Sequence, residues 1–170
     1  MEIKSTFTNR SGQLLDVVYR DIESELDLGN RNVTGVHVYC FYEDKLLVVY
    51  TLSKGYWTPV GGGVEVGESL LDAVRREVKE ESNMEVLEHC FIGCQDIFES
   101  KGVISQTRSV CIVKPYGMFV KDVDGDITEI RLIDPKDYKE YFDWKEIGDH
   151  IMKRALELKA QMETVVDFKN

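Results

Sequence analysis

The sequence predicts an α+β fold in which two helices cover a mixed β-sheet. Segments rich in β-branched and aromatic residues recur along the chain and indicate several strands, whereas apolar residues follow helical spacing in two segments, 70–82 and 143–163. These helices do not alternate strictly with the strands. The length of 170 residues fits one domain, since domains commonly hold roughly 100 to 200 residues. We therefore expect residues 1–170 to form one domain around a shared sheet.

The predicted strands begin with an N-terminal β-hairpin. Residues 1–30 contain "EIKSTFTNRSGQLLDVVYRD", in which "NRSGQ" is typical of a turn between two strands. The next segment, "NVTGVHVYCFYEDKLLVVYTL", predicts two strands joined near Glu43 and Asp44, the second of them buried on both faces. Three more strands are expected near residues 86–94, 105–114 and 129–133. The hairpin is an extension of the core, and a homodimer formed through it is compatible with the sequence.

The first helix is predicted over residues 70–82. Ser69 is a suitable N-cap, Asp72 stands where the acid of a capping box belongs, and no proline interrupts the segment. At about 100° per residue, one apolar stripe forms on the helix. It consists of Leu70, Leu71, Val74 and Val78.

The last helix is predicted over residues 143–163. Asp143 can cap it, and Glu146 occupies the fourth position of a capping box. Its apolar face is expected to pack against the sheet, and consists of Trp144, Ile147, Ile151, Ala155, Leu158 and Met162.

Three glutamates of the first helix converge at the rim of its buried stripe. Glu81 falls inside the apolar arc, and Glu77 and Glu80 lie beside it. Like charges at this spacing cost about 0.2–0.5 kcal/mol per pair when exposed, and more when desolvated. Arg76 can neutralise one of them, whereas a hard divalent cation uses several carboxylate oxygens at once. The alternative is a charged helix whose glutamates extend into solvent.

Glycines precede this helix. Gly61, Gly62, Gly63 and Gly67 surround residues 64–66, so the backbone can turn tightly and approach a ligand where a Cβ would obstruct it. A tight hairpin alone would also explain such a run. Together with the acidic helix, however, it favours a metal and phosphate site.

The region 61–84 resembles the Nudix box, written G-x5-E-x7-R-E-U-x-E-E-x-G-U, where U is a bulky aliphatic residue. Eight of the nine specified positions fit: Gly62, Glu68, Arg76, Glu77, Val78, Glu80, Glu81 and Met84. The ninth is Asn83 in place of glycine. That position ends the helix, where a left-handed conformation is expected, and asparagine tolerates this conformation well. The substitution is therefore expected to preserve the site.

The resemblance implies a Nudix-like α/β/α sandwich that hydrolyses a pyrophosphate bond with Mg²⁺ or Mn²⁺. By position in the box, Glu77, Glu80 and Glu81 would be catalytic metal ligands, and one of them could act as the base. Arg76 and Glu68 would hold these carboxylates in place. Gly61 would offer a backbone carbonyl to the metal.

The substrate is expected to be a small nucleoside diphosphate derivative, namely a nucleoside triphosphate, a nucleotide-sugar or a dinucleotide. Arg108 can meet a phosphate, and Tyr56, Trp57 and Phe98 can stack on a base, although packing explains each of these side chains as well. The alternative function is a Nudix-fold sensor or regulatory module that binds a nucleotide without cleaving it. Intact acidic positions in the box favour the enzyme.

Composition limits the partners. The net charge of −10 disfavours binding to extended nucleic acid, and no segment approaches the ~18 apolar residues of a membrane span. Four cysteines form no CxxC pair, and the first ten residues contain no apolar signal region. We therefore expect a cytoplasmic protein without a membrane partner.

Overall fold

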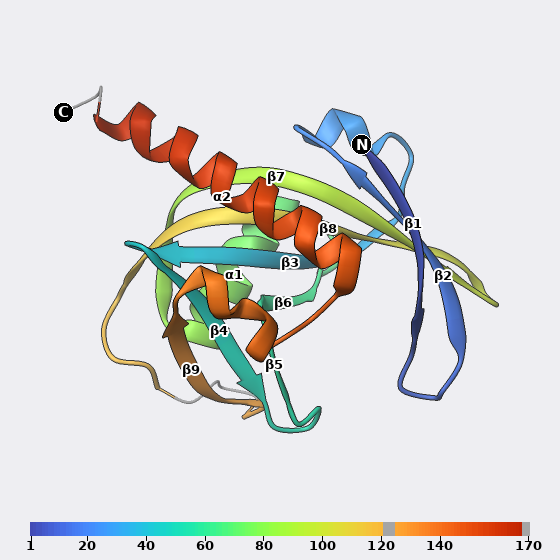
Figure 1. Ribbon diagram of the computed structural model, residues 1–170, viewed down its shortest axis with the longest axis horizontal. Coiled ribbons are helices and arrows are strands. Elements are labelled where there is room, and N and C mark those ends of the chain that lie inside the picture. Colours follow the sequence, from blue (N-terminus) through green and yellow to red (C-terminus); the bar gives the residue numbers. More distant parts are fainter. Residues whose placement is uncertain (121–124, 168–170) are drawn as a thin grey trace.

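One mixed sheet organises the molecule, and the computed structural model describes it over residues 1–120 and 125–167, with side chains to residue 164 (Figure 1). Seven strands follow the order β1-β2-β7-β8-β3-β4-β5, while β6 pairs with β3 and β9 pairs with β4. β3 runs parallel to β8, and the other described pairs are antiparallel. The strands are β1 (Glu2–Thr8), β2 (Leu14–Asp21), β3 (Val33–Tyr42), β4 (Lys45–Thr51), β5 (Tyr56–Thr58), β6 (Val60–Gly63), β7 (Met84–Glu99), β8 (Gly102–Pro115) and β9 (Ile127–Ile133).

Two α-helices lie on opposite faces of this sheet. In Figure 1, α2 (Lys145–Asp167) crosses the near face and α1 (Leu70–Ser82) lies behind the strands. Short 3-10 helices occupy Glu25–Leu28 and Pro135–Glu140. The α+β class, the mixed sheet and the position of the first helix are therefore confirmed.

The core has two layers because neighbouring residues of a strand point to opposite faces. On the α1 face, strand residues such as Val36 and Val49 pack with Val74 and Val78. On the α2 face, a second cluster contains Tyr39, Phe41, Leu46, Val48, Ile147, Ile151 and Ala155. Leu46 to Val49 are all fully buried, which confirms that β4 is covered on both faces.

The predicted N-terminal hairpin is present and extends the central sheet. β1 and β2 pair antiparallel, and β2 continues along β7 from Asp16 opposite Phe98 to Asp21 opposite Gly93. Asp96 of β7, which is 7% exposed, accepts hydrogen bonds from Arg20 (2.7 Å) and from Arg31 (3.2 Å). The hairpin is thus joined to the core by both backbone pairing and a buried charge cluster.

Several elements have other boundaries than expected, and β9 begins at Ile127 instead of residue 129. β7 and β8 reach further than residues 86–94 and 105–114, because their outer ends pair with each other and β7 also pairs with the hairpin. The last helix extends to Asp167 and begins at Lys145 instead of residue 143. The Asp143 carboxylate accepts a hydrogen bond from the backbone N–H of Lys145 at 2.8 Å. Asp143 therefore still provides an acceptor for one of the free N–H groups at this end of the helix.

Candidate active site

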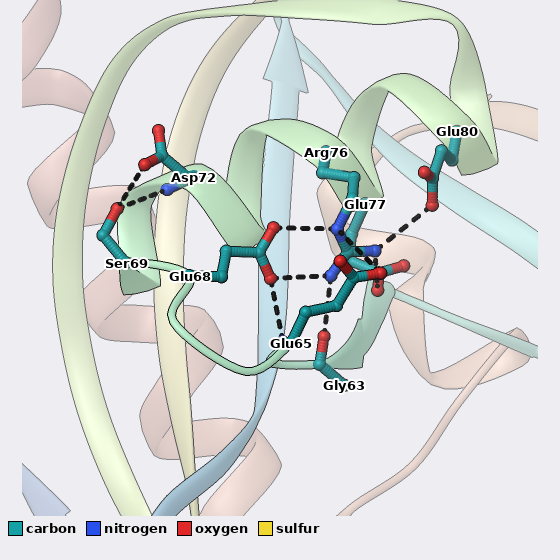
Figure 2. A network of polar contacts seen from close by, with 8 residues as sticks. All are labelled: Gly63, Glu65, Glu68, Ser69, Asp72, Arg76, Glu77 and Glu80. Atoms are coloured by element: carbon teal, nitrogen blue, oxygen red, sulfur yellow. Dashed lines mark hydrogen bonds and ion pairs between the residues drawn. The ribbon is translucent and has the colours of Figure 1, made fainter.

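The ends of α1 are defined by local hydrogen bonds. The Ser69 hydroxyl accepts the backbone N–H of Asp72 (3.1 Å) and donates to the Asp72 carboxylate (2.7 Å), as Figure 2 shows. At the other end Asn83 has φ 55° and ψ 38°, the left-handed conformation expected there. Its side-chain amide also donates to the Met118 carbonyl (2.9 Å), which the sequence did not indicate.

The glycines of β6 allow α1 to approach the sheet closely. A Cβ on Gly62 would lie 2.2–2.5 Å from the carboxyl group of Glu77, which therefore occupies the space that glycine leaves free. A Cβ on Gly61 would lie 2.5 Å from the Val36 carbonyl oxygen of β3. The Gly61 N–H donates to the Glu81 carboxylate at 3.0 Å. Glu77 and Glu81, two of the predicted metal ligands, therefore lie directly against β6.

Arg76 connects the loop before α1 with the helix itself (Figure 2). Its Nε and Nη2 donate to the two oxygens of Glu68 at 2.8 and 3.0 Å, and Nη2 also donates to the Gly63 carbonyl at 2.8 Å. Nη1 donates to Glu77 (2.7 Å) and to Glu80 (3.2 Å). The planar guanidinium satisfies several acceptors at once, which lysine could not do in this geometry.

The carboxylates of this network have different electrostatic environments. The hydrogen bonds from Arg76 lower the pKa of Glu68 and raise that of the guanidinium. Burial raises the pKa of Glu77, which is 8% exposed, and the charge of Arg76 offsets only part of this effect. Negative charge on Glu77 is therefore incompletely compensated, and a nearby cation would stabilise it.

The donor set fits a hard divalent cation. Glu77, Glu80, Glu81 and the Gly61 carbonyl would supply oxygen ligands only, as Mg²⁺ and Mn²⁺ prefer. Within residues 1–120 and 125–167, no three His, Cys, Asp or Glu side chains are already gathered as metal ligands. Arg76 instead lies between Glu77 and Glu80, so a cation would have to draw Glu80, whose side chain is 44% exposed, away from Arg76.

The aromatic residues considered for stacking lie in three different settings. Trp57 packs with Tyr50 and Tyr141 at ring-centroid distances of 5.3 and 5.7 Å. Tyr56 is half exposed at the start of β5. Phe98 lines a hollow of about 290 Å³ with hairpin residues including Lys4 and Val18.

Arg108 is buried on the α2 face of β8 with only 3% exposure. Its guanidinium hydrogen-bonds Gln95 (3.2 Å) and Gln106 (3.4 Å) and lies 5.6 Å from the ring centroid of Trp144. Sequence reasoning did not single out these neighbours, although strand periodicity places Gln106 and Arg108 on one face. The sequence alone does not indicate which strand lies opposite.

A second hollow, of about 860 Å³, adjoins the outer side of α1. Arg75, Lys79, Glu80 and Tyr116 are among the residues that line it. The Lys79 ammonium lies 5.4 Å from the centre of the Tyr116 ring. Glu80 thus borders open space on the outer side of α1.

The segment after β8 contains three aspartates, Asp122, Asp124 and Asp126. Asp122 and Asp124 lie outside the described residues. Asp126 accepts hydrogen bonds from the Ser53 backbone N–H (2.9 Å) and hydroxyl (3.0 Å), so this carboxylate stabilises the loop after β4.

The sequence matches the family model of the NUDIX domain over residues 31–155. The chain therefore belongs to the NUDIX family. A comparison with curated proteins finds no match. No described helix is both long and apolar enough to span a membrane.

Solved structures show the same fold at low sequence identity. A pyrophosphohydrolase of Bacillus subtilis has 17% identity and a TM-score of 0.70, with 90% of this chain and 96% of the other covered. An Ap4A hydrolase of C. elegans has 17% identity and a TM-score of 0.51, with 74% and 98% covered. The NUDIX domain of Shewanella oneidensis NrtR, complexed with ADP ribose, has 15% identity and a TM-score of 0.52, with 79% and 92% covered.

Proposed function

We propose that this protein hydrolyses a pyrophosphate bond in a nucleoside diphosphate derivative and requires Mg²⁺ or Mn²⁺. The observation that carries the proposal is the set of carboxylates on α1, held by Arg76 and fitted against glycines of β6. Ap4A, after which one structurally similar hydrolase is named, and ADP ribose, which is bound in another similar structure, both contain pyrophosphate linkages and support this substrate class.

Glu77, Glu80, Glu81 and the carbonyl of Gly61 would hold the cation in this site. A bound divalent ion neutralises pyrophosphate charge and lowers the pKa of a coordinated water. Arg76 and Glu68 are positioning residues, because their bidentate pair fixes the loop relative to α1. The hydrogen bond from Gly61 orients the Glu81 carboxylate. A carboxylate of this cluster within reach of the attacking water would accept its proton.

The four cysteines support a cytoplasmic location. Cys40, Cys90, Cys94 and Cys111 are free thiols, and three of them are buried. Burial raises the pKa of each, so the thiols stay protonated and unreactive. Unpaired cysteines are usual in a reducing compartment.

A substrate panel tests the proposed reaction. Nucleoside triphosphates, dinucleotides, nucleotide-sugars and ADP-ribose would be incubated with Mg²⁺ or Mn²⁺, and released phosphate, pyrophosphate or mononucleotide measured. We expect turnover of at least one class, and its loss after chelation. Glu81→Gln should reduce the rate by about 100-fold or more, because it removes a charged ligand and a candidate base.

Glu88→Gln is the matched control for this variant. Glu88 is exposed on β7 and lies outside the carboxylate network, so its neutral variant should hydrolyse at the parental rate. No turnover of any substrate with either metal would contradict the proposed function. Equal rates for Glu81→Gln and the parent would contradict the assigned role of Glu81.

A further inference from the structure

Four polar residues form a cluster on the α2 face of the sheet, beside the proposed catalytic site. His37 of β3 pairs in register with Arg108 of β8, and Gln95 and Gln106 hydrogen-bond the Arg108 guanidinium. We call these four residues the Arg108 cluster. Its arginine is buried, whereas the other three side chains are only half-buried, so the cluster reaches the surface.

Arg108 differs from the other partly or fully buried arginines in lacking a carboxylate partner. Arg20 and Arg31 pair with Asp96, and Arg76 pairs with Glu68. Within the described parts of the chain, no Asp or Glu oxygen lies within 4.0 Å of the Arg108 guanidinium nitrogens. Burial lowers the pKa of this group. The buried positive charge is therefore met by neutral groups, namely the oxygens of Thr107, Gln95 and Gln106 and the Trp144 ring, instead of by a carboxylate.

The cluster consists mainly of hydrogen-bond donors. A guanidinium can only donate, so the amides of Gln95 and Gln106 must direct their oxygens toward Arg108. The NH2 groups of both amides are then left to meet another acceptor. Arg108 Nε and His37 Nδ1 are shielded from solvent and have no hydrogen-bond partner. The two amide NH2 groups make this part of the cluster complementary to a ligand edge that carries acceptors.

One strand separates the cluster from the acidic site. His37 is opposite Gly61 in the β3–β6 register, and a Cβ on Gly61 would lie 3.3 Å from the His37 ring. The same Gly61 donates to Glu81, and the Glu77 carboxyl group occupies the space where a Cβ of the adjacent Gly62 would lie. A nucleotide with its pyrophosphate at the carboxylates can therefore extend its base across β6 to the Arg108 cluster.

We propose that the Arg108 cluster selects a 6-oxopurine base, guanine or hypoxanthine, against adenine. The inference rests on the proposed function, because it assigns the base of that substrate. The O6 and N7 atoms of guanine both accept hydrogen bonds, whereas the N6 amino group of adenine is a donor and would face other donors. The rings of Trp144 and His37, with centroids 5.6 Å apart, provide apolar contacts for a planar base.

Metal-free binding of mononucleotides tests this selection separately from hydrolysis. GMP, IMP and AMP would each be titrated into the protein, with calorimetry and tryptophan fluorescence as readouts. We expect GMP and IMP to bind about 10-fold or more tightly than AMP, since a good bidentate contact discriminates bases by about 1–3 kcal/mol. Equal affinities for GMP and AMP, or no measurable binding of either, would overturn the proposal.

Gln106→Glu tests whether the lack of a carboxylate beside Arg108 is responsible for the preference. The new carboxylate would pair with Arg108 and repel acceptor atoms, so the preference for GMP over AMP should fall to below about twofold, while the melting temperature is kept or raised. A purely structural role would not change the ratio. Gln13→Glu, in the exposed turn of the hairpin, introduces the same charge change far from the cluster and should keep the parental preference.

The two proposals can fail independently. Selective GMP binding without hydrolysis of any substrate would retain the Arg108 cluster and refute the enzyme activity. Hydrolysis of GTP and ATP at equal rates, with equal affinity for their monophosphates, would retain the enzyme and refute the base selection. A Gln106→Glu variant that stays folded and keeps the parental GMP preference would also refute the cluster's role.

Discussion

Gly62 and Gly63 are neighbours of the same residue type, yet the structure requires only one of them to be glycine. A Cβ on Gly62 would overlap the Glu77 carboxyl group, whereas a Cβ on Gly63 would meet only the Thr34 carbonyl oxygen, at 3.9 Å. Neither residue has a positive φ that would favour glycine. The difference arises because the Glu77 side chain of α1 points at Gly62 and not at Gly63.

Gly62→Ala should therefore impair the site more than the fold. The new methyl group would displace the flexible end of Glu77, so we expect hydrolysis to fall about 10-fold or more while the melting temperature changes by only a few degrees. Hydrolysis rates and thermal unfolding measure the two effects. Gly63→Ala is the matched control and should resemble the parent. Similar activity losses in both variants would show that the contact with Glu77 is not the cause.

The length of helix α1 is set by the residues at its two ends. Ser69 caps its first turn, and Asn83, whose own backbone has the left-handed conformation, ends it. Asn83 also accepts the Tyr116 backbone N–H (3.0 Å) and donates to the Met118 carbonyl, so this helix end holds the segment after β8. The residue that departs from the box pattern thus satisfies the backbone requirement and adds a tertiary contact.

Substitutions at Asn83 separate these two roles. Asn83→Gly keeps the left-handed conformation accessible, and its activity should stay within a few fold of the parent. Asn83→Ala loses the hydrogen bond and adds the left-handed cost for a residue with a Cβ, so its free energy of unfolding should fall by about 1–2 kcal/mol. Urea unfolding and hydrolysis rates provide the measurements. A collapse of activity in Asn83→Gly would show that the site depends on the side-chain hydrogen bond to Met118 and not only on the helix end.

Asp21 connects the N-terminal hairpin with α2 through ion pairs and a hydrogen bond. Its carboxylate lies 3.1 Å from the N-terminal ammonium and 2.8 Å from Nε2 of His150. Arg154 of α2 is 3.8 Å away. Burial alone would raise the pKa of Asp21, but the hydrogen bonds and charges of these partners outweigh it and lower the pKa below its usual value.

Asp21→Asn should destabilise the protein in a pH-dependent way. Because the pKa of Asp21 is lowered in the fold, its stabilisation is complete above the usual value near 3.8 and is lost as pH falls through the folded value. We expect a loss of about 1–2 kcal/mol at pH 7 that shrinks toward zero in acid, measured by denaturant unfolding across pH. Asp16→Asn, on the exposed side of β2, should show no such loss. A constant difference at every pH would contradict this account.

Prediction from sequence succeeded where the determining contacts are local. The bounds of α1 follow from Ser69 and Asn83, which act within one turn of the helix. It was less accurate for β7 and β8, because their outer ends are stabilised by strands distant in the sequence. Phe98 shows the same limit: it was considered for base stacking, but β2 lies beside it and places it with the hairpin.

The acidic helix, its caps and the glycines before it can be read from the amino-acid sequence, since helical spacing and backbone conformation are properties of short segments. Three features became visible only in the fold: Glu77 occupies the space above Gly62, Arg76 lies between Glu77 and Glu80, and Arg108 is buried without a carboxylate partner. These features depend on which strands become neighbours. The pairing of strands depends on the burial of apolar side chains over the whole sheet, and the spacing of residues along the chain does not reveal it.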